Sequence, residues 1–238
     1  MTTFAAHAKR LMGPRIVTRV RCALGGYDQP RWGNLRRTRP FSESYGFERG
    51  TPIDRHYLHR FLDTHRDLIT GDVLEVQNSA YTTRYGHDLK RTETLDIVPM
   101  FQPTYLCDLA RSDAILPSAS YDCVLLPNTL QHLRDLDACL RNVIRVVRPG
   151  GVILASAAGM IPLTGDTPDY WRLSPDGWRE KLASAWPDVE IDVAGHGNCL
   201  AAIAAQLGLA LEELTTAELD AYDTRYPVLT TILCRTRR

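Results

Sequence analysis

Short apolar segments of strand length alternate with amphipathic helical segments over most of this chain, and this alternation restricts its fold more than any other feature. Residues 121–126 and 152–156 are apolar enough to be strands buried on both faces of a sheet. Between them, residues 135–147 repeat apolar side chains at helical spacing and are followed by Pro149-Gly150-Gly151, which stops a helix. Weaker examples predict further strands at 72–76, 93–97, 105–107, 189–193 and 228–234, and further helices at 51–67, 174–186 and 200–209. The chain is therefore predicted to be an α/β protein with a doubly wound sheet of seven strands.

The first 50 residues differ from the rest in composition. Seven arginines lie between Met12 and Tyr45, together with glycines and prolines that interrupt regular structure. This pattern predicts an irregular, basic arm at residues 1–50, with one short strand at 16–23, ahead of a domain at 51–238. A loop of this length is usually either functional or disordered. We expect a lid over the site or an arm of a homodimer, and a solvated arm is the alternative.

Charge and apolar content exclude several classes of protein. The chain has 28 basic and 28 acidic residues, so its formal net charge is zero, whereas a dedicated nucleic-acid binder carries a basic surplus. No apolar run approaches the roughly 20 residues of a membrane span, and the N-terminus lacks the apolar stretch of a secretory signal. The six cysteines show no C-x-x-C spacing, so neither a zinc site nor a disulfide framework is predicted. We therefore expect a cytoplasmic protein with no nucleic-acid partner and no membrane partner.

Carboxylates stand at the ends of three predicted strands. Glu75 lies in the first strand, Asp96 follows about 20 residues later, and Asp108 ends the next strand. Ligands of such sheets bind outside the carboxyl ends of the strands. A carboxylate at Asp96 can accept from both hydroxyls of a ribose, and one at Asp108 suits the exocyclic amine of adenine. For each aspartate, a capping or turn-forming role is the alternative.

These segments resemble those of class I S-adenosylmethionine-dependent methyltransferases. The resemblance covers residues 50–195 and rests on Val73-Leu-Glu-Val76, Leu95-Asp-Ile97, Cys107-Asp-Leu109, Tyr121-Asp-Cys-Val-Leu-Leu126 and Arg145-Val-Val-Arg-Pro-Gly-Gly151. It implies a Rossmann-like, doubly wound, mostly parallel sheet of seven strands with an antiparallel last strand, and S-adenosyl-L-methionine as the cofactor. It also implies the cofactor-binding residues: Glu75 beneath the methionine portion, Asp96 at the ribose, and Asp108 with Leu109 at the adenine, with Gln77, Asn78 and Asn128 beside them.

One departure from the family concerns the first turn. Its members carry glycines after the first strand, where the backbone approaches the cofactor, whereas this chain has Gln77-Asn78-Ser79-Ala80 and no glycine before Gly86. Small polar residues can form a tight turn, and asparagine tolerates the left-handed conformation. The departure leaves open a relative that does not bind the cofactor in the ordinary way.

Within the superfamily, residues 47–55 and 169–172 are similar to those of the sugar O-methyltransferases of mycobacterial methylmannose polysaccharide biosynthesis. The resemblance implies methyl transfer to a hydroxyl of a sugar or oligosaccharide, with a mannoside as one option. Asp169, Tyr170, Trp171 and Arg172 would then bind the acceptor, because aromatic faces stack on sugars and Asp and Arg exchange hydrogen bonds with hydroxyls. The alternative is a structural Trp171 packed on the sheet, with Arg172 paired to Asp169.

A sugar hydroxyl is a very weak acid, so its methylation needs a group that removes the proton. His132 follows the fourth strand and is the predicted base, with a histidine on a helix surface as the alternative. His196, after the sixth strand, is the second candidate and a predicted substrate-binding residue. Mg²⁺ can also acidify a hydroxyl, and Asp169 is the acid best placed to hold it, although the sequence shows no ligand cluster. The metal requirement stays open.

Other functions stay open as well. The fold can serve as a non-catalytic association module, and the acceptor can be another small molecule or a nucleic acid whose phosphates the arginine-rich arm holds. Methyltransferases that act on the nitrogen of a base carry an Asn/Asp-Pro-Pro-Tyr/Phe motif after the fourth strand, whereas this chain has Leu126-Pro127-Asn128-Thr129. No Gly-x-Gly-x-x-Gly follows the first strand, which argues against a nicotinamide dehydrogenase.

Overall fold

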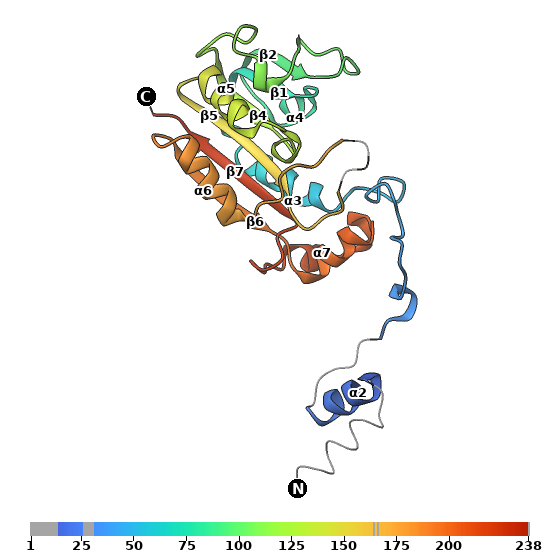
Figure 1. Cartoon of the computed structure of the whole chain (residues 1–238). Helices are drawn as coiled ribbons and strands as arrows, with labels where there is room; N and C mark the ends of the chain where they lie inside the picture. The colour runs from blue at the N-terminus through green and yellow to red at the C-terminus, as the bar shows by residue number, and fades with distance from the viewer. Residues whose placement is uncertain (1–13, 26–30, 164, 166, 238) are drawn as a thin grey trace. The chain divides into compact units, whose positions relative to one another are not determined.

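The computed structural model describes residues 14–25, 31–163, 165 and 167–237 of the chain (Figure 1). It divides into two compact units, residues 1–39 and residues 40–238. The second unit therefore begins ahead of the boundary expected at residue 51. The described part of the first unit forms helix α2 (Pro14–Leu24) and a short 3-10 turn, η1 (Gly33–Leu35).

Helix α2 replaces the strand predicted at 16–23, and that prediction is wrong. Pro14 is its first residue, where a missing amide proton costs no hydrogen bond. Ile16, Val20 and Leu24 recur every four residues, which is helical spacing. The β-branched residues of this segment favour a strand, but the proline at the first helical position and the helical spacing of the apolar residues outweigh that preference. The rest of the predicted arm, at 1–13 and 26–30, lies outside the described residues.

The second unit is built on one mixed sheet. Its strands run in the order β3-β2-β1-β4-β5-β7-β6, and every neighbouring pair is parallel except the two pairs that involve β7. The strand order reverses between β1 and β4, where α/β sheets bind ligands at their carboxyl edge. The described residues thus confirm the predicted fold, a seven-stranded, mostly parallel sheet with an antiparallel last strand. The strands are β1 (Gly71–Val76), β2 (Leu89–Asp96), β3 (Tyr105–Leu106), β4 (Tyr121–Leu126), β5 (Val147–Ala158), β6 (Glu190–His196) and β7 (Leu229–Arg235).

Helices cover both faces of this sheet (Figure 1). Strand β4 shows why both faces need cover, since Val124 and Leu126 belong to one buried cluster while Cys123 and Leu125 belong to the other. The first cluster takes its helical side chains from α5 and α6, and the second takes them from α3, α4, α7 and α8. The helices are α3 (Asp54–Thr64), α4 (Ala80–Tyr85), α5 (Leu136–Val146), α6 (Pro175–Ala185), α7 (Cys199–Gln206) and α8 (Thr216–Asp220).

Several elements differ from the predicted ones, among them β2, which begins at Leu89 and not at residue 93. Helix α4 was not predicted, because six residues are too few to show an apolar period. Strand β5 begins at Val147 and runs through Pro149 and the two glycines that were expected to precede it, with Gly150 at φ +81°. In the part of the chain that the structure describes, no helix combines the length and the apolar content needed to cross a membrane.

Candidate active site

Glu75 anchors the carboxyl edge of the sheet at the end of β1, and only 1% of its surface is exposed. Its Oε1 accepts from the Tyr81 amide (3.1 Å), and its Oε2 accepts from the amide (2.8 Å) and the hydroxyl (2.7 Å) of Thr82. Burial raises the pKa of this carboxyl, and the hydrogen bonds from Thr82 and Tyr81 oppose that rise. Glu75 therefore holds the first turn of α4 and, with it, the loop between β1 and α4.

The loop after β1 makes its sharp turn without glycine. Gln77 has φ of +78°, in the left-handed region, and its amide donates to the Leu95 carbonyl of β2 (2.8 Å). Asn78 accepts from the Ala80 amide through Oδ1 (3.0 Å). The left-handed conformation costs a residue with a side chain about 1–2 kcal/mol. The backbone thus adopts a conformation that glycine would allow without strain, while Gln77 adds an exposed side chain at the edge.

Asp96 and Asp108 lie at neighbouring strand ends. One oxygen of Asp96, the last residue of β2, accepts from the two amides that follow it (2.6 and 3.2 Å). One oxygen of Asp108, after β3, accepts from an amide (2.9 Å) and caps the 3-10 turn η3 (Leu109–Arg111). Each aspartate therefore stabilises a turn through one carboxylate oxygen, and its second oxygen takes no part in these hydrogen bonds. The side chain of Leu109 is buried in the core below them.

A network that the sequence did not reveal joins α3 to the ends of β4 and β5. Asn128, with φ of +48°, donates through Nδ2 to Oδ2 of Asp54 (2.7 Å) and through its amide to the Ser156 hydroxyl (2.7 Å). The Ser156 hydroxyl donates in turn to Oδ1 of Asn128 (3.0 Å). Arg55 donates through Nη1 to the same oxygen of Asp54. A buried carboxylate and a guanidinium thus meet beside the loop that follows β4.

No local pattern identifies this network. Asp54 is an ordinary acid for the first turn of a helix, and its partner Asn128 lies 74 residues further along the chain. Tyr81 of α4 lies near it, since the charges of Arg55 and Asp54 both act on its hydroxyl, and burial raises the pKa of that hydroxyl. The Asp54-Arg55 pair therefore lies close enough to Tyr81 of α4 for its charges to act on that side chain.

His132 ends the 3-10 turn η4 (Leu130–His132) beyond β4. Its Nδ1 lies 3.0 Å from the Pro168 carbonyl oxygen, and its Nε2 lies 3.1 Å from Nε2 of Gln131. Because a carbonyl only accepts, Nδ1 carries the proton, and the lone pair on Nε2 accepts from the Gln131 amide. The same Gln131 nitrogen donates to the Asn128 carbonyl (2.7 Å). His132 is thus tied through one side chain to the loop that holds the Asp54 network.

The segment at 169–172 uses its charges within the chain. Arg172 donates through Nε and Nη2 to both oxygens of Asp169 (3.1 and 2.7 Å). Its remaining N–H groups donate to the carbonyls of Gly159 (2.8 Å), Ile161 (3.2 Å) and Pro162 (3.1 Å). All five guanidinium donors are therefore engaged, and the predicted contact between Arg172 and a sugar hydroxyl has no donor left. Arg172 instead holds the loop that follows β5.

The two aromatic residues of this segment differ in exposure. Trp171 donates through Nε1 to the Leu133 carbonyl (2.7 Å) and packs against the first buried cluster, as in the structural alternative. Tyr170 is 45% exposed, so its ring can meet a ligand. Of the four residues at 169–172 that were predicted to bind the acceptor, Tyr170 alone presents an exposed large side chain.

His196 is the last residue of β6 and lies on the face of the sheet that α3 covers. Its ring stacks on Tyr57 of α3, with centroids 6.0 Å apart and planes inclined by 22°. Its Nε2 lies 2.7 Å from the Thr231 hydroxyl. Among the described residues, no hydrogen bond or ring contact joins His196 to His132. The two histidines therefore do not act on each other directly.

No group of three or more His, Cys, Asp or Glu side chains in the described segments is arranged to hold a metal ion. Asp169 is already bound to Arg172 through both oxygens. An Mg²⁺ requirement is therefore a question for the activity assay.

Part of the chain matches a known family of proteins. Residues 64–155 match the sequence model of a family described as "Methyltransferase domain". No curated protein matches the chain.

Several solved structures share the fold. A SAM-dependent methyltransferase from Archaeoglobus fulgidus is 13% identical, with 82% of this chain and 100% of that chain covered and a TM-score of 0.52. The DhpI–SAM–HEP complex is 17% identical, with 81% and 91% covered and a TM-score of 0.52. An S-adenosylmethionine-dependent methyltransferase from Mesorhizobium loti is 16% identical, with 77% and 99% covered and a TM-score of 0.51. At these identities the likeness is one of fold.

Proposed function

We propose that this chain, which carries a class I methyltransferase domain with S-adenosyl-L-methionine as its cofactor, transfers the methyl group to a hydroxyl of a sugar or oligosaccharide. The observation that carries the cofactor part of the proposal is the pair of buried Asp54 and part-buried Arg55, next to Asn128 at the carboxyl edge of the sheet. The pair offers one carboxylate and one guanidinium side by side. Such a pair complements a ligand that carries an ammonium and a carboxylate on one carbon atom.

The residues at this edge fit the cofactor group by group. Asp54 and Arg55 would hold the amino and carboxylate groups of its methionine portion, above the turn of Gln77 and Asn78 that Glu75 positions. The second oxygen of Asp96 would hold the ribose, and that of Asp108 the adenine. When bound, S-adenosylmethionine supplies an electrophilic methyl group on sulfur.

On the acceptor side, His132 is the residue that would take the hydroxyl proton. Its Nε2 holds the lone pair, and the hydrogen bond from Nδ1 to Pro168 keeps the ring in that tautomer. The Gln131 amide occupies the lone pair in this structure, so an acceptor hydroxyl would have to displace it. The exposed ring of Tyr170, two residues after Pro168, would stack on the sugar ring.

Residues 40–50 contact two other segments of the second unit. The Tyr45 hydroxyl donates to the Leu163 carbonyl (2.8 Å) in the loop after β5, and Arg49 pairs with Glu213. These contacts support the part of the lid proposal that falls on residues 40–50. We further propose a cytoplasmic homodimer, which sedimentation of the full chain tests.

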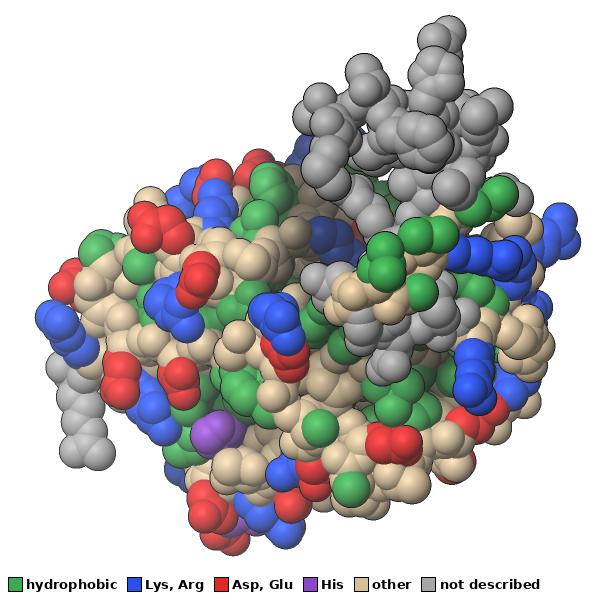
Figure 2. Space-filling model, turned by 90° about the horizontal axis from the view of Figure 1, so that it is seen from below, with side chains coloured by type: hydrophobic (Ala, Val, Ile, Leu, Met, Phe, Trp, Pro, Cys, Tyr) green, Lys and Arg blue, Asp and Glu red, His purple; other side chains and the backbone are tan. Residues whose placement is uncertain are grey.

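Figure 2 shows acidic and basic side chains interspersed over much of one face of the molecule. On this face, the mixture of charges favours a small-molecule or oligosaccharide acceptor over a nucleic acid, whose binding uses a continuous basic stripe. Strongly salt-dependent binding of DNA or RNA would contradict this preference.

The test is a screen of oligosaccharide acceptors, methylated and unmethylated, with cofactor labelled in its methyl group, run with and without Mg²⁺. We expect label in at least one carbohydrate product. Label only in a nucleic acid or in a non-carbohydrate small molecule would overturn the acceptor class. Absence of cofactor binding in isothermal titration would overturn the proposal that the chain is an enzyme and would favour a non-catalytic association module.

A further inference from the structure

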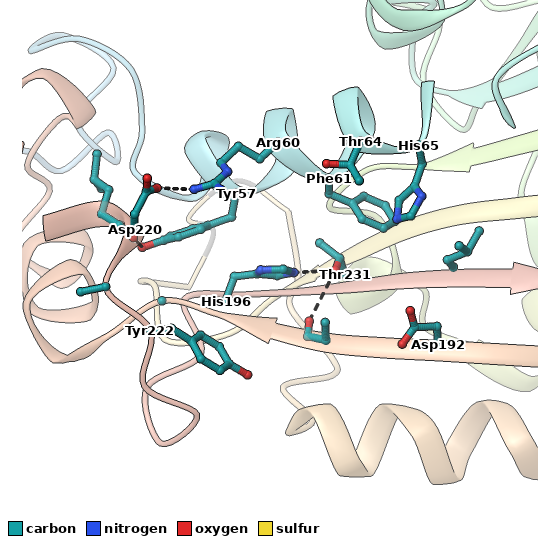
Figure 3. Close-up of a pocket in the computed structure, with 15 residues that line it drawn as sticks. Tyr57, Arg60, Phe61, Thr64, His65, Asp192, His196, Asp220, Tyr222 and Thr231 are labelled. Carbon is teal, nitrogen blue, oxygen red and sulfur yellow. Dashed lines mark hydrogen bonds and ion pairs between the residues drawn. The ribbon is translucent and has the colours of Figure 1, made fainter. Parts of the chain in front are cut away.

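A slot of about 320 Å³ opens between α3 and the face of strands β6 and β7 (Figure 3). We propose that it is a second ligand site, which binds one ring of a neutral carbohydrate. None of the residues proposed above to hold the cofactor lines it. Its volume lies near the lower end of the range of small-ligand pockets, about 300–1,000 Å³, which suits a single pyranose ring.

The slot exists because of a small residue between two polar ones on β6. Side chains alternate along a strand, so Asp192, Ala194 and His196 share the face that looks toward α3. Ala194 lies opposite Thr231 of β7. The methyl group of Ala194 leaves a hollow floor, and Asp192 and His196 form its two ends.

Hydrogen-bond acceptors line the slot. The Thr231 hydroxyl donates to the Ala194 carbonyl (3.5 Å), so it accepts from Nε2 of His196 (2.7 Å). Nδ1 of His196 then holds a lone pair that has no hydrogen-bond partner among the described residues. Burial, with the charge of Arg60, lowers the pKa of His196 and keeps this nitrogen an acceptor. Asp192 adds a carboxylate at the other end.

Aromatic side chains form the remaining walls. Phe61 and Tyr57 come from α3, and Tyr222, which is 66% exposed, lies in the segment after α8 (Figure 3). The polarised C–H groups of a sugar ring pack on aromatic faces, while its hydroxyls both donate and accept. An aromatic wall opposite mixed polar groups is therefore complementary to a polyhydroxylated ring.

The charges of the slot favour a neutral ligand. Arg60 is already paired with Asp220, which also lies 3.0 Å from Nε2 of His56. An anion would meet the carboxylates of Asp192 and Asp220, and a cation would meet Arg60. Placing a charge beside a like charge in a partly enclosed pocket costs free energy that a neutral sugar avoids.

The test is binding of methyl α-D-mannopyranoside and methyl β-D-glucopyranoside to the full chain, measured by saturation-transfer NMR and isothermal titration without cofactor. We expect saturable binding of at least one glycoside, with a Kd of roughly millimolar order. The measurement needs neither cofactor nor methyl transfer, and variants of the slot distinguish binding there from binding of the same glycoside at the acceptor site beside His132. Absence of saturable binding, or displacement of the glycoside by inorganic phosphate, would overturn the proposal.

Two variants locate the site. Ala194→Leu fills the floor of the slot and should weaken binding about tenfold or more, whereas Ala183→Leu, on the exposed face of α6, should leave it unchanged. Tyr222→Ala removes an exposed aromatic wall and should weaken binding about threefold to tenfold without disturbing the core. Thermal unfolding checks that each variant is folded. Wild-type affinity in folded Ala194→Leu, or in Tyr222→Ala if the leucine variant does not fold, refutes the assignment.

Discussion

Asp54→Asn separates the structural role of Asp54 from its proposed role toward the cofactor. The substitution keeps the shape of the side chain and removes its charge. The new amide can still accept from Nδ2 of Asn128 through its oxygen, so the link between α3 and the loop after β4 survives. What is lost is the charge that attracts Arg55 and that would attract the ammonium group of the cofactor.

The substitution should change the free energy of unfolding less than it changes the affinity for the cofactor. A hydrogen bond to a charged group contributes about 1.5–3 kcal/mol and a neutral one about 0.5–1.5 kcal/mol, so each of the two bonds to Asp54 weakens by about 1 kcal/mol. Arg55 is 26% exposed and regains water, so the free energy of unfolding should fall by only about 1–2 kcal/mol. Removing the charged partner of the ammonium should raise the Kd for S-adenosylmethionine about 10- to 100-fold.

Urea denaturation measures the first effect, and isothermal titration with S-adenosylmethionine measures the second. Asp63→Asn is the matched control, since Asp63 lies on the same helix with 66% of its side chain exposed. It should change neither quantity by more than the error of the measurement. A folded Asp54→Asn variant that binds the cofactor as tightly as the wild type would refute the assignment of Asp54 to the cofactor.

Four further predictions test other parts of the chain. His132→Ala should lower turnover about 10²- to 10⁴-fold while isothermal titration finds the cofactor affinity unchanged, and near-normal turnover would reassign the base. In Arg172→Lys, the ammonium group cannot replace the five N–H donors of the guanidinium. Urea denaturation should therefore show that the free energy of unfolding falls by about 2 kcal/mol. Gln77→Gly removes the strain of the left-handed conformation but also raises the conformational entropy of the unfolded chain. The two effects oppose each other, so urea denaturation should show a gain in the free energy of unfolding of no more than about 1 kcal/mol. The hydrogen bond from Arg49 lowers the pKa of Glu213 from 4.5 to about 2, so the stability it contributes is present above pH 4.5 and is lost as the pH falls toward 2. The protection of the amides at residues 46–51, taken relative to their intrinsic exchange rates, should therefore fall over that range, and Arg49→Gln should reduce this fall.

The sequence predicted the sheet well because the information for it is local. The period of apolar residues is set by neighbouring residues, and the observed sheet confirms the seven strands that it predicted, although β5 runs through the Pro-Gly-Gly sequence that was expected to precede it. The same local reasoning failed at 16–23, where β-branched residues and a helical period lie in one segment. It also missed α4, which is too short to show a period and is held by the buried Glu75.

The sequence by itself determined that acidic side chains stand at the carboxyl edge of a doubly wound sheet, because strand ends and parallel topology place Glu75, Asp96 and Asp108 there. Only the tertiary structure decided what each side chain contacts. The pairing of Asp54 with Asn128 depends on how α3 docks against β4, and the slot at Ala194 depends on the register of β6 with β7. Docking and register are set by burying whole faces of elements far apart in the chain, so no local pattern carries them.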